Sequence, residues 1–301
     1  MRDRPYVSVI IPVYNDPARL RLCLEALDRQ SYPADRYEVL VVDNGSEPPV
    51  RDVLAEVLAR RPHVRLLEEA RPGSYAARNL GISEARGDIL AFTDSDCIPE
   101  ARWIEEGVRA LRNLPDGGLV GGRIEVFAAD PARPRAVELY EMAVAFDQRK
   151  NIEVRRFAVT ANAFTTRGVV ERIGGFDPAL RSGGDHEWGT RVWRSGYPLV
   201  YAADAVVRHP ARATFGEIAW KMVRVAHGHH ALAERRPLLH RLAEWPRFLA
   251  PPFSVLALIA RTKELEGAGA RIRAGVVAVA VKYAWSWARI RLALGLTVEA
   301  R

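Results

Sequence analysis

The fold of this chain is indicated first by the stretch Val7-Ser8-Val9-Ile10-Ile11-Pro12-Val13-Tyr14-Asn15. Its β-branched residues predict a short buried strand that Pro12 closes, with polar residues following. The same succession of an apolar run and a polar end recurs further along the chain. It is found in Tyr37–Val42 before Asp43-Asn44-Gly45-Ser46, and in Asp88–Thr93 before Asp94-Ser95-Asp96; His63–Leu67 is a further apolar run. The sequence therefore predicts four strands in its first hundred residues.

Helical patterns separate these strands. Residues 17–30 place leucines at helical spacing behind a proline suited to a first helical turn, and residues 50–60 and 75–85 also predict helices. Strands that alternate with helices form a parallel, doubly wound sheet with both faces covered. Ligands of such sheets bind beyond the carboxyl ends of the strands, where the polar clusters of this sequence lie. We therefore expect these clusters to converge on one crevice.

The remaining sequence divides at about residue 214. From residue 118 an apolar run reaches Phe127, helices are expected over 135–147 and 187–194, and 216–301 is helical in character. The net charge of +7 belongs to the last 87 residues, which hold 14 Lys/Arg and 6 Asp/Glu, whereas residues 1–214 hold 30 and 31. We therefore expect an α/β domain over 1–214 and a basic, amphipathic helical region over 215–301.

Composition excludes several classes of protein. With 49% hydrophobic and 27% charged residues, the chain is neither collagen-like, nor a coiled coil, nor wholly disordered. Two cysteines, Cys23 and Cys97, cannot build a disulfide framework or a tetra-cysteine zinc site, which favours a reducing cytoplasmic location. The N-terminus leads into a strand-like run and not into a signal-peptide core.

Three segments carry candidate ligand-binding chemistry, and the first two of them also have a plainer alternative. The carboxylates of Asp94 and Asp96 can hold Mg²⁺ or Mn²⁺ together with phosphate oxygens, or they can belong to a solvated turn. Asp43 can accept hydrogen bonds from a base, or its segment can be only a turn. The segment Arg71–Asn79 can hold pyrophosphate through helix N–H groups and Arg78. No Gly-x-Gly-x-x-Gly or Walker sequence is present, which argues against nicotinamide dinucleotides and ATPases.

Two further features concern acid–base chemistry and metal binding. The stretch Gly183-Gly184-Asp185-His186-Glu187-Trp188 places two acids at a probable helix start, where they can be helix-dipole partners. Asp185 also suits a general base that takes a proton from an acceptor hydroxyl. His209 is a lone histidine at a strand end, which is structural in most proteins and a metal ligand in some.

Taken together, these motifs resemble family 2 glycosyltransferases with the GT-A fold. The resemblance covers about residues 5–212. It is carried by Val9–Asn15, Val41–Ser46, Ala76-Ala77-Arg78-Asn79, Thr93–Cys97 and Gly184–Trp188, with Thr160–Phe164 and Gly174–Asp177 similar to the acceptor-side region. It implies a mixed, mainly parallel, Rossmann-like sheet flanked by helices. Residues up to about 117 would then form the nucleotide-binding half and about 118–214 the acceptor-binding half.

The resemblance also implies roles for individual residues. Those lining the nucleotide-sugar site would be Pro12, Tyr14, Asn15, Asp43, Arg78, Asp94, Ser95 and Asp96. Asp96 and His209 would hold a divalent cation, Mn²⁺ or Mg²⁺. Asp185 would be the base, with Glu187 and Trp188 on the acceptor side. Many members have Glu-Asp where this chain has Gly184-Asp185. Either Asp185 or Glu187 could therefore be the base, and Asp185 is favoured.

The implied reaction is inverting, metal-dependent transfer of a sugar from a nucleotide diphosphate to an acceptor hydroxyl in glycoconjugate synthesis. UDP-sugars are the first expectation, with GDP- and dTDP-sugars open, and the acceptor would be a carbohydrate or a lipid-linked molecule. A sugar-phosphate nucleotidyltransferase would need a glycine-rich, basic N-terminal signature that is missing here. A nucleic-acid-binding module using the basic tail is disfavoured because the first 214 residues are neutral and the tail is rich in alanine and leucine.

The basic tail has two readings. Its apolar stretches, Phe248–Ala260 and Gly275–Ala288, fall short of the ~20 residues that span a bilayer. The run from Lys282 to Arg289 mixes cations and aromatic residues, which suits an amphipathic helix on an anionic membrane, at the inner face of the cell membrane. It equally suits a helical layer packed on the catalytic domain. Helical tails of this kind can also form a homodimer.

Overall fold

A computed structural model describes residues 4–234 and 250–293. The chain forms two compact units. The first contains Met1–Glu125, Asp147–Ala179 and Gly184–His209, and the second contains Val126–Phe146, Leu180–Gly183 and Pro210–Arg301. The chain passes between them five times, and two of these passages fall within strands β6 (Leu119–Phe127) and β8 (Leu199–Pro210). All the site residues predicted from the sequence belong to the first unit.

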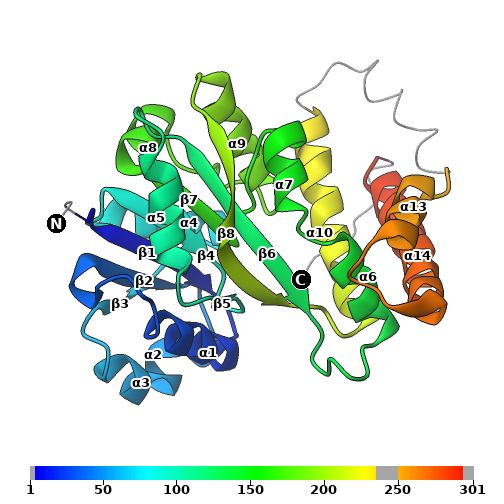
Figure 1. The fold of residues 1–301 in the computed structure, drawn as a ribbon, viewed down its shortest axis with the longest axis horizontal. Helices are drawn as coiled ribbons and strands as arrows, with labels where there is room; N and C mark the ends of the chain where they lie inside the picture. Colours follow the sequence, from blue (N-terminus) through cyan, green and yellow to red (C-terminus); the bar gives the residue numbers. More distant parts are fainter. Residues whose placement is uncertain (1–3, 235–249, 294–301) are drawn as a thin grey trace. The chain divides into compact units, whose positions relative to one another are not determined.

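Parallel strands build the N-terminal half of the first unit, as predicted. They are β1 (Val7–Val13), β2 (Tyr37–Asp43), β3 (Val64–Glu68) and β4 (Ile89–Thr93). Strand β1 pairs with both β2 and β4, in a register that sets Val13 opposite Asp43 (Figure 1). Every residue of β1, β2 and β4 is buried, which explains their continuous apolar runs. The polar residues that follow these strands thus lie at one edge of the sheet.

The second half of the sheet is antiparallel, so the sheet is mixed. Strand β7 (Asn162–Thr166) runs antiparallel to β4 and β6, and the two-residue β5 (Ile98–Pro99) runs antiparallel to β8. The eight strands follow the order β3-β2-β1-β4-β7-β6-β8-β5. The buried amide of Asn162 joins this half together, because it donates to the carbonyls of Arg123 and Ala205 and accepts from the Trp103 indole.

The helices of the first unit are α1 (Pro17–Leu27), α2 (Val50–Val53), α3 (Ala55–Ala59), α4 (Ser74–Glu84), α5 (Trp103–Arg112), α7 (Gln148–Lys150), α8 (Arg167–Ile173) and α9 (Gly184–Arg194), with a 3₁₀ turn η1 (Ala34–Arg36) and a π turn η2 (Asn151–Arg155). Three of these helices, α1, α4 and α9, follow predicted spans, whereas α5, α7 and α8 were not predicted. The single helix predicted over 50–60 is wrong, because the backbone leaves the helical region at Leu54 (φ −116°, ψ 18°).

The second unit is a helical bundle. It contains α6 (Ala136–Val144), α10 (Phe215–Glu234), α13 (Phe253–Arg261) and α14 (Gly267–Ala293). Small and branched side chains of α14 pack against α6, α10 and α13, with Leu139 and Ile218 among the buried partners. The predicted helical character of 216–301 is thus confirmed where it is described. Part of the predicted apolar stretch Phe248–Ala260 lies outside the described residues.

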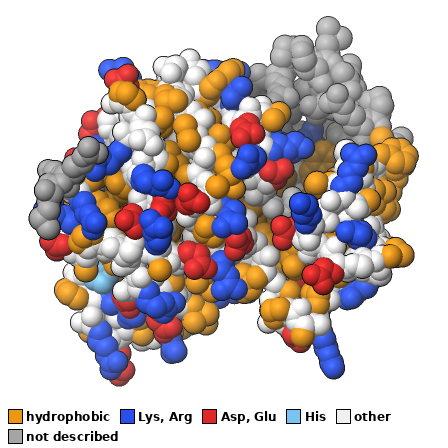
Figure 2. Space-filling view, in the orientation of Figure 1, with side chains coloured by type: hydrophobic (Ala, Val, Ile, Leu, Met, Phe, Trp, Pro, Cys, Tyr) orange, Lys and Arg blue, Asp and Glu red, His pale blue; other side chains and the backbone are white. Residues whose placement is uncertain are grey.

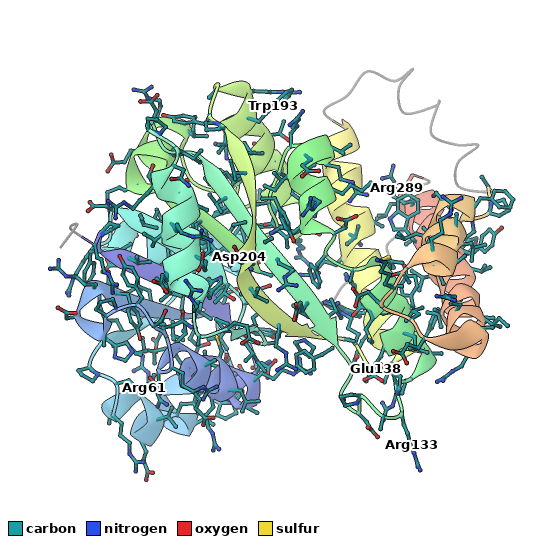
Figure 3. The ribbon with its side chains drawn as sticks, in the orientation of Figure 1. Arg61, Arg133, Glu138, Trp193, Asp204 and Arg289 are labelled. Atoms are coloured by element: carbon teal, nitrogen blue, oxygen red, sulfur yellow. The ribbon has the colours of Figure 1, made fainter. Side chains whose placement is uncertain are left out.

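Buried carboxylates hold α6 in place within this unit. Glu138, labelled in Figure 3, caps the helix by accepting from the backbone N–H groups of Arg135 and Ala129. Glu141 is also buried and accepts hydrogen bonds from Arg212 and Lys221. Burial raises the pKa of Glu141, but the two cations outweigh that effect and the net pKa is lowered.

Candidate active site

An aspartate pair follows β4 at the sheet edge. Asp94 Oδ1 accepts a hydrogen bond of 2.5 Å from the guanidinium of Arg78, which comes from α4 and is buried. The Nε of Arg78 is also buried and has no hydrogen-bond partner among the residues that the structure describes. A buried guanidinium with an unused donor is suited to an anionic ligand. The structure therefore brings the side chains of Arg78 and Asp94 together.

Four potential ligand atoms lie around this pair. They belong to Asp94, Asp96, Cys97 and His209, and all lie within 4.8 Å of one another. The Nε2 of buried His209, near the end of β8, lies 3.6 Å from Asp96 Oδ2. Burial first, and then the charges of Asp96 and Asp94, raise the pKa of the Cys97 thiol well above its usual value, so the thiol stays protonated.

The residues present fit a borderline-hard divalent cation. Carboxylate oxygens and one imidazole nitrogen suit Mn²⁺, whereas a protonated thiol is a poor ligand. Among these groups Asp96 and His209 face each other, while Asp94 is engaged by Arg78. The family resemblance implied that Asp96 and His209 hold a cation together, whereas Cys97 was not among the predicted ligands.

The loops after β1 and β2 are joined by hydrogen bonds. The backbone N–H of Asn15 donates to Ser46 Oγ at 2.9 Å, and Asn15 Oδ1 accepts from the Glu47 N–H at 2.8 Å. Asn15 lies in the left-handed region (φ 52°), which asparagine tolerates. Tyr14 beside it is 64% exposed, whereas Pro12 is buried within β1. An exposed aromatic ring at the sheet edge is available for stacking on a planar ligand.

Asp43 is committed to its own loop. Its Oδ1 accepts from the Ser46 N–H at 3.0 Å and its Oδ2 from the Val50 N–H at 2.9 Å, and the residue is buried. Each carboxylate oxygen can accept a second hydrogen bond, so this geometry leaves capacity for a ligand. The two hydrogen bonds that the Asp43 carboxylate already accepts stabilise the loop that leads into α2.

Asn44 is a site residue that the sequence analysis did not single out. Its amide donates to the carbonyls of Glu69 and Arg71 and accepts from the Gly73 N–H at 2.7 Å. These three bonds close the loop before α4, which bears Arg78. Gly73 has a φ of 121°, which L side chains rarely adopt. An Asn beside an Asp at a strand end is a weak signal, because both residues are common in turns.

Asp185 sits at the first turn of α9 and is held from two sides. Its carboxylate accepts from the backbone N–H of Thr160 at 3.3 Å and from the Thr160 hydroxyl at 3.1 Å. The N–H groups of Gly184 and Asp185 donate to the hydroxyl of Tyr75. Burial is the main cause that raises the pKa of Asp185, while the positive charge of Arg78 opposes it. A carboxylate of raised pKa is a better proton acceptor.

Packing explains why glycine precedes Asp185. A Cβ at position 184 would lie 2.6 Å from the Tyr75 ring, so this position has no room for a side chain while the ring stays there. The ring of Tyr75 also stacks on Phe176, at 5.7 Å between centroids. This chain has Gly184 where many family members have Glu, and the ring of Tyr75 on α4 occupies the space that a side chain at position 184 would need.

Glu187 and Trp188 are bound into the same region by structural contacts. Glu187 forms an ion pair at 2.6 Å with Arg191, which also donates to the carbonyls of Ile173 and Gly175. The buried Trp188 donates its indole N–H to the Gly174 carbonyl. Both carboxylate oxygens of Glu187 thus accept hydrogen bonds from the guanidinium of Arg191.

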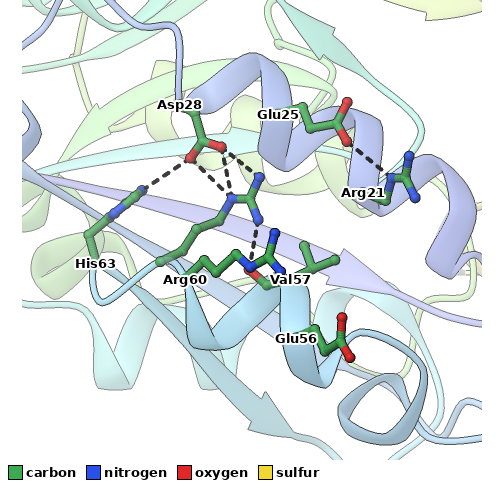
Figure 4. Close-up of a pocket in the computed structure, with 8 residues that line it drawn as sticks. Arg21, Glu25, Asp28, Glu56, Val57, Arg60 and His63 are labelled. Atoms are coloured by element: carbon green, nitrogen blue, oxygen red, sulfur yellow. Dashed lines mark hydrogen bonds and ion pairs between the residues drawn. The ribbon is translucent and has the colours of Figure 1, made fainter.

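Another hollow of the first unit, about 510 Å³ in volume, lies between α1, α3 and His63 (Figure 4). Four of its charged side chains form two ion pairs, Arg61 with Asp28 and Arg21 with Glu25. None of the predicted site residues lines it. We therefore assign it no ligand.

Comparison with known proteins identifies the family. The model of the family described as "Glycosyl transferase family 2" matches residues 8–174, which include β1, β4 and the aspartate pair. The chain belongs to glycosyltransferase family 2. It is 41% identical over 225 residues to the glycosyltransferase AglE of Haloferax volcanii, covering 74% of this chain and 73% of AglE. This glycosyltransferase is therefore a transferase enzyme, as the motifs implied.

More distant relatives agree with this assignment. A Methanococcus voltae enzyme named for transfer of a diacetamido-dideoxy-glucuronosyl group to a dolichyl-linked N-acetylglucosaminyl phosphate is 22% identical, covering 69% of this chain and 68% of the relative. The mannosyltransferase PcManGT of Pyrobaculum calidifontis, solved with GDP-Man and Mn²⁺, has a TM-score of 0.59 and 24% identity, covering 94% of this chain and 88% of PcManGT. The latter likeness confirms the predicted GT-A fold of this glycosyltransferase.

Proposed function

We propose that this glycosyltransferase is inverting and metal-dependent, and that it transfers a sugar from a nucleotide diphosphate, a UDP-sugar in the first instance, to an acceptor hydroxyl. The observation that carries the proposal is the meeting of Asp94, Asp96 and His209 ligand atoms beside the buried guanidinium of Arg78. Such a site suits a diphosphate that departs with growing negative charge.

The donor would lie across the edge formed by β1, β2 and β4. The ring of Tyr14 would stack on the nucleobase, and Asn15 and Asp43 would fix the loop around that ring. Asp94 and Ser95 would face the ribose. Asp96 and His209 would hold Mn²⁺ or Mg²⁺, which when bound supplies positive charge to the leaving diphosphate. Arg78 would donate its unused Nε–H to an oxygen of the same group. Arg78 would thereby stabilise the transition state, in which negative charge grows on the leaving diphosphate, more than it stabilises the intact donor.

Asp185 would act as the base. Its raised pKa and its fixed position beside Thr160 suit a carboxylate that accepts the proton of the acceptor hydroxyl. As that proton leaves, the acceptor oxygen attacks the anomeric carbon from the face opposite the diphosphate, and the bond from that carbon to the diphosphate breaks. Attack from the opposite face inverts the anomeric configuration. Glu187 and Trp188 would shape the acceptor side without transferring a proton.

The acceptor is proposed to be a carbohydrate or a lipid-linked saccharide. The Methanococcus voltae relative is named for a dolichyl-linked substrate, which supports the lipid-linked class. This class of acceptor is consistent with work at the inner face of the cell membrane, in the synthesis of glycoconjugates. Among the described residues no helix is long and apolar enough to cross a membrane.

Replacing Thr160 with Val should shift the pH profile of this enzyme. The substitution removes the hydroxyl donor that stabilises the charged form of Asp185, so the pKa of Asp185 rises further. Because the base must be deprotonated, the activity of the variant should already be lost at a higher pH as the solution is acidified, so the acidic limb of the kcat profile should move to higher pH. Thr165→Val, which removes a hydroxyl bonded to the Gly118 carbonyl, is the matched control. Equal profiles for the Thr160 variant and wild type would contradict the role of Asp185.

The donor site is tested by thermal stability with UDP, GDP and dTDP, each with Mn²⁺ and with EDTA. A ligand that binds only the folded state raises stability by about 2.7 kcal/mol at a hundred times its Kd. We expect one diphosphate to raise Tm selectively, and only with metal. That result would identify the base of the donor. If none of the three diphosphates raises Tm, or if EDTA leaves the rise unchanged, the result contradicts a metal-dependent donor site.

A further inference from the structure

Helix α14 of the second unit exposes an apolar stripe. Successive residues of an α-helix are turned by about 100°, so residues three or four apart share a face. Five large apolar residues of α14 are exposed and lie within an arc of about 80° by this spacing. They are Ile272 (67% exposed), Val276 (67%), Val279, Tyr283 and Trp287 (63%). The neighbouring α13 adds exposed Phe253 and Leu258. In Figure 2 hydrophobic side chains gather at the right edge, where Figure 1 draws α13 and α14.

The opposite face of α14 already has its partners. Ala274 and Ala278 are buried with Leu139 of α6 and Ile259 of α13, and Val281 packs with Ile218 of α10. Packing among the described residues of the second unit therefore accounts for one side of the helix. Exposed apolar surface that forms a continuous stripe is a mark of an interaction site, whereas scattered exposed residues are normal.

Cations flank this stripe on both sides. Helix α14 contains five cations and no acid in its 27 residues. By helical spacing Arg271 and Lys282 lie on one side of the stripe, and Arg273 and Arg291 lie on the other, about 80–120° from its middle. Arg289, labelled in Figure 3, is buried near Trp285 and is left out of this arrangement. Long cationic side chains in such positions reach polar groups while an apolar face is covered.

We propose that this stripe docks on the surface of an anionic lipid bilayer, with α14 lying in the plane of the interface. Trp287 and Tyr283 would occupy the headgroup boundary, and Ile272 and Val276 would enter the acyl region. The flanking cations would contact lipid phosphates, with Arg271 and Arg273 turning from the carbonyls of Thr262 and Pro134 to which they donate without lipid. Charge decides between occupants. A second copy of the chain would bring a helix of the same positive sign, whereas an anionic bilayer complements it. The proposed lipid-linked acceptor explains why this enzyme would dock on a membrane, so the inference rests on the proposed function in that respect. The test of docking does not depend on the acceptor.

The experiment compares full-length wild type with the triple variant Ile272→Ser, Val276→Ser, Trp287→Ser. Both are floated with vesicles of phosphatidylcholine alone and of phosphatidylcholine mixed with phosphatidylglycerol. Wild type should bind the mixed vesicles, bind phosphatidylcholine more weakly, and dissociate as salt is raised. The triple variant should lose on the order of 100-fold in partitioning, because three apolar side chains no longer enter the bilayer. The control Leu22→Ser, Val53→Ser changes two exposed apolar residues (47% and 44%) on helices of the first unit and should bind as wild type does.

Several outcomes would overturn the inference. These are equal binding by wild type and the triple variant, or no binding of wild type to mixed vesicles. Dimers of wild type that the triple variant converts to monomers, without vesicle binding, would assign the stripe to a second copy. A large fall in Tm of the triple variant without lipid would place the stripe in internal packing.

Failure of this inference can be told apart from failure of the proposed function. The triple variant leaves the first unit untouched, so it should keep the metal-dependent stabilisation by a nucleoside diphosphate. Loss of vesicle binding with intact diphosphate binding supports the docking stripe. Vesicle binding by a wild type that no diphosphate stabilises would leave the stripe standing and remove the donor site.

Discussion

Asp185→Asn should abolish sugar transfer while leaving donor binding intact. The variant keeps the size of the side chain and an oxygen that accepts from Thr160, but it cannot take a proton. Loss of a positioned base costs about 10²–10⁴-fold in turnover. The metal-dependent shift in Tm with a nucleoside diphosphate should match that of wild type, because Asp96, His209 and Arg78 are unchanged. Product formation under saturating donor is the measurement.

Stability gives a second, independent sign. Burial raises the pKa of Asp185 in the folded protein. Ionising Asp185 therefore costs more free energy in the folded protein than in the unfolded chain. Its contribution to stability is therefore present at low pH and lost as pH rises through the folded pKa. Asparagine removes this penalty, so Asp185→Asn should unfold at the same Tm or a higher one near neutral pH. An inactive variant that is also no less stable would separate a catalytic role from damage to the fold.

Glu187→Gln is the matched control. It changes the other acid of the same helix, two residues away, and weakens its pair with Arg191. We expect turnover within a few-fold of wild type and a loss of at most about 1 kcal/mol of stability. Normal turnover in Asp185→Asn, or a larger loss in Glu187→Gln than in Asp185→Asn, would overturn the assignment of the base.

The sheet and the placement of its polar residues could be predicted because their signals are local. Apolar runs that end in Asn15, Asp43 and Asp94 define both the strands and the edge at which they finish. Parallel strands bring their carboxyl ends to one edge, so no knowledge of distant contacts was needed. The bonds from Asn15 to Ser46 and Glu47 confirm that two of these ends meet.

The residues that position the site could not be predicted, because they act across long separations in the sequence. Thr160 meets Asp185 across 25 residues, and Tyr75 meets Gly184 across 109. Only the packing of α4, α9 and the segment before β7 brings them together. The same limit explains Asn44, whose hydrogen-bonding partners lie 25 to 29 residues away. Side chains that shape a loop have no periodic signal of their own.

Asp96→Asn should remove metal binding and, with it, donor binding. The substitution replaces a charged carboxylate, 3.6 Å from His209 Nε2, by a neutral amide of the same size. Hard divalent cations favour charged oxygen ligands, so we expect Mn²⁺ affinity to fall by about 10²–10³-fold. Titration of Mn²⁺ followed by the signal of the free ion in electron paramagnetic resonance measures this without a substrate. The diphosphate-dependent shift in Tm should disappear together with the Mn²⁺ binding.

Two neighbouring substitutions make the Asp96 result specific. Ser95→Ala alters the residue between the aspartates and should retain Mn²⁺ binding. Asp94→Asn should instead destabilise the fold by about 3 kcal/mol, because it leaves the buried guanidinium of Arg78 without its carboxylate. Asp94 thus supports a buried cation of the protein, whereas Asp96, which lies 3.9 Å from the Arg19 guanidinium and 3.6 Å from His209, is the aspartate that we propose to hold a cation from solution. Wild-type Mn²⁺ affinity in Asp96→Asn, or equal loss of stability in both aspartate variants, would refute this division of roles.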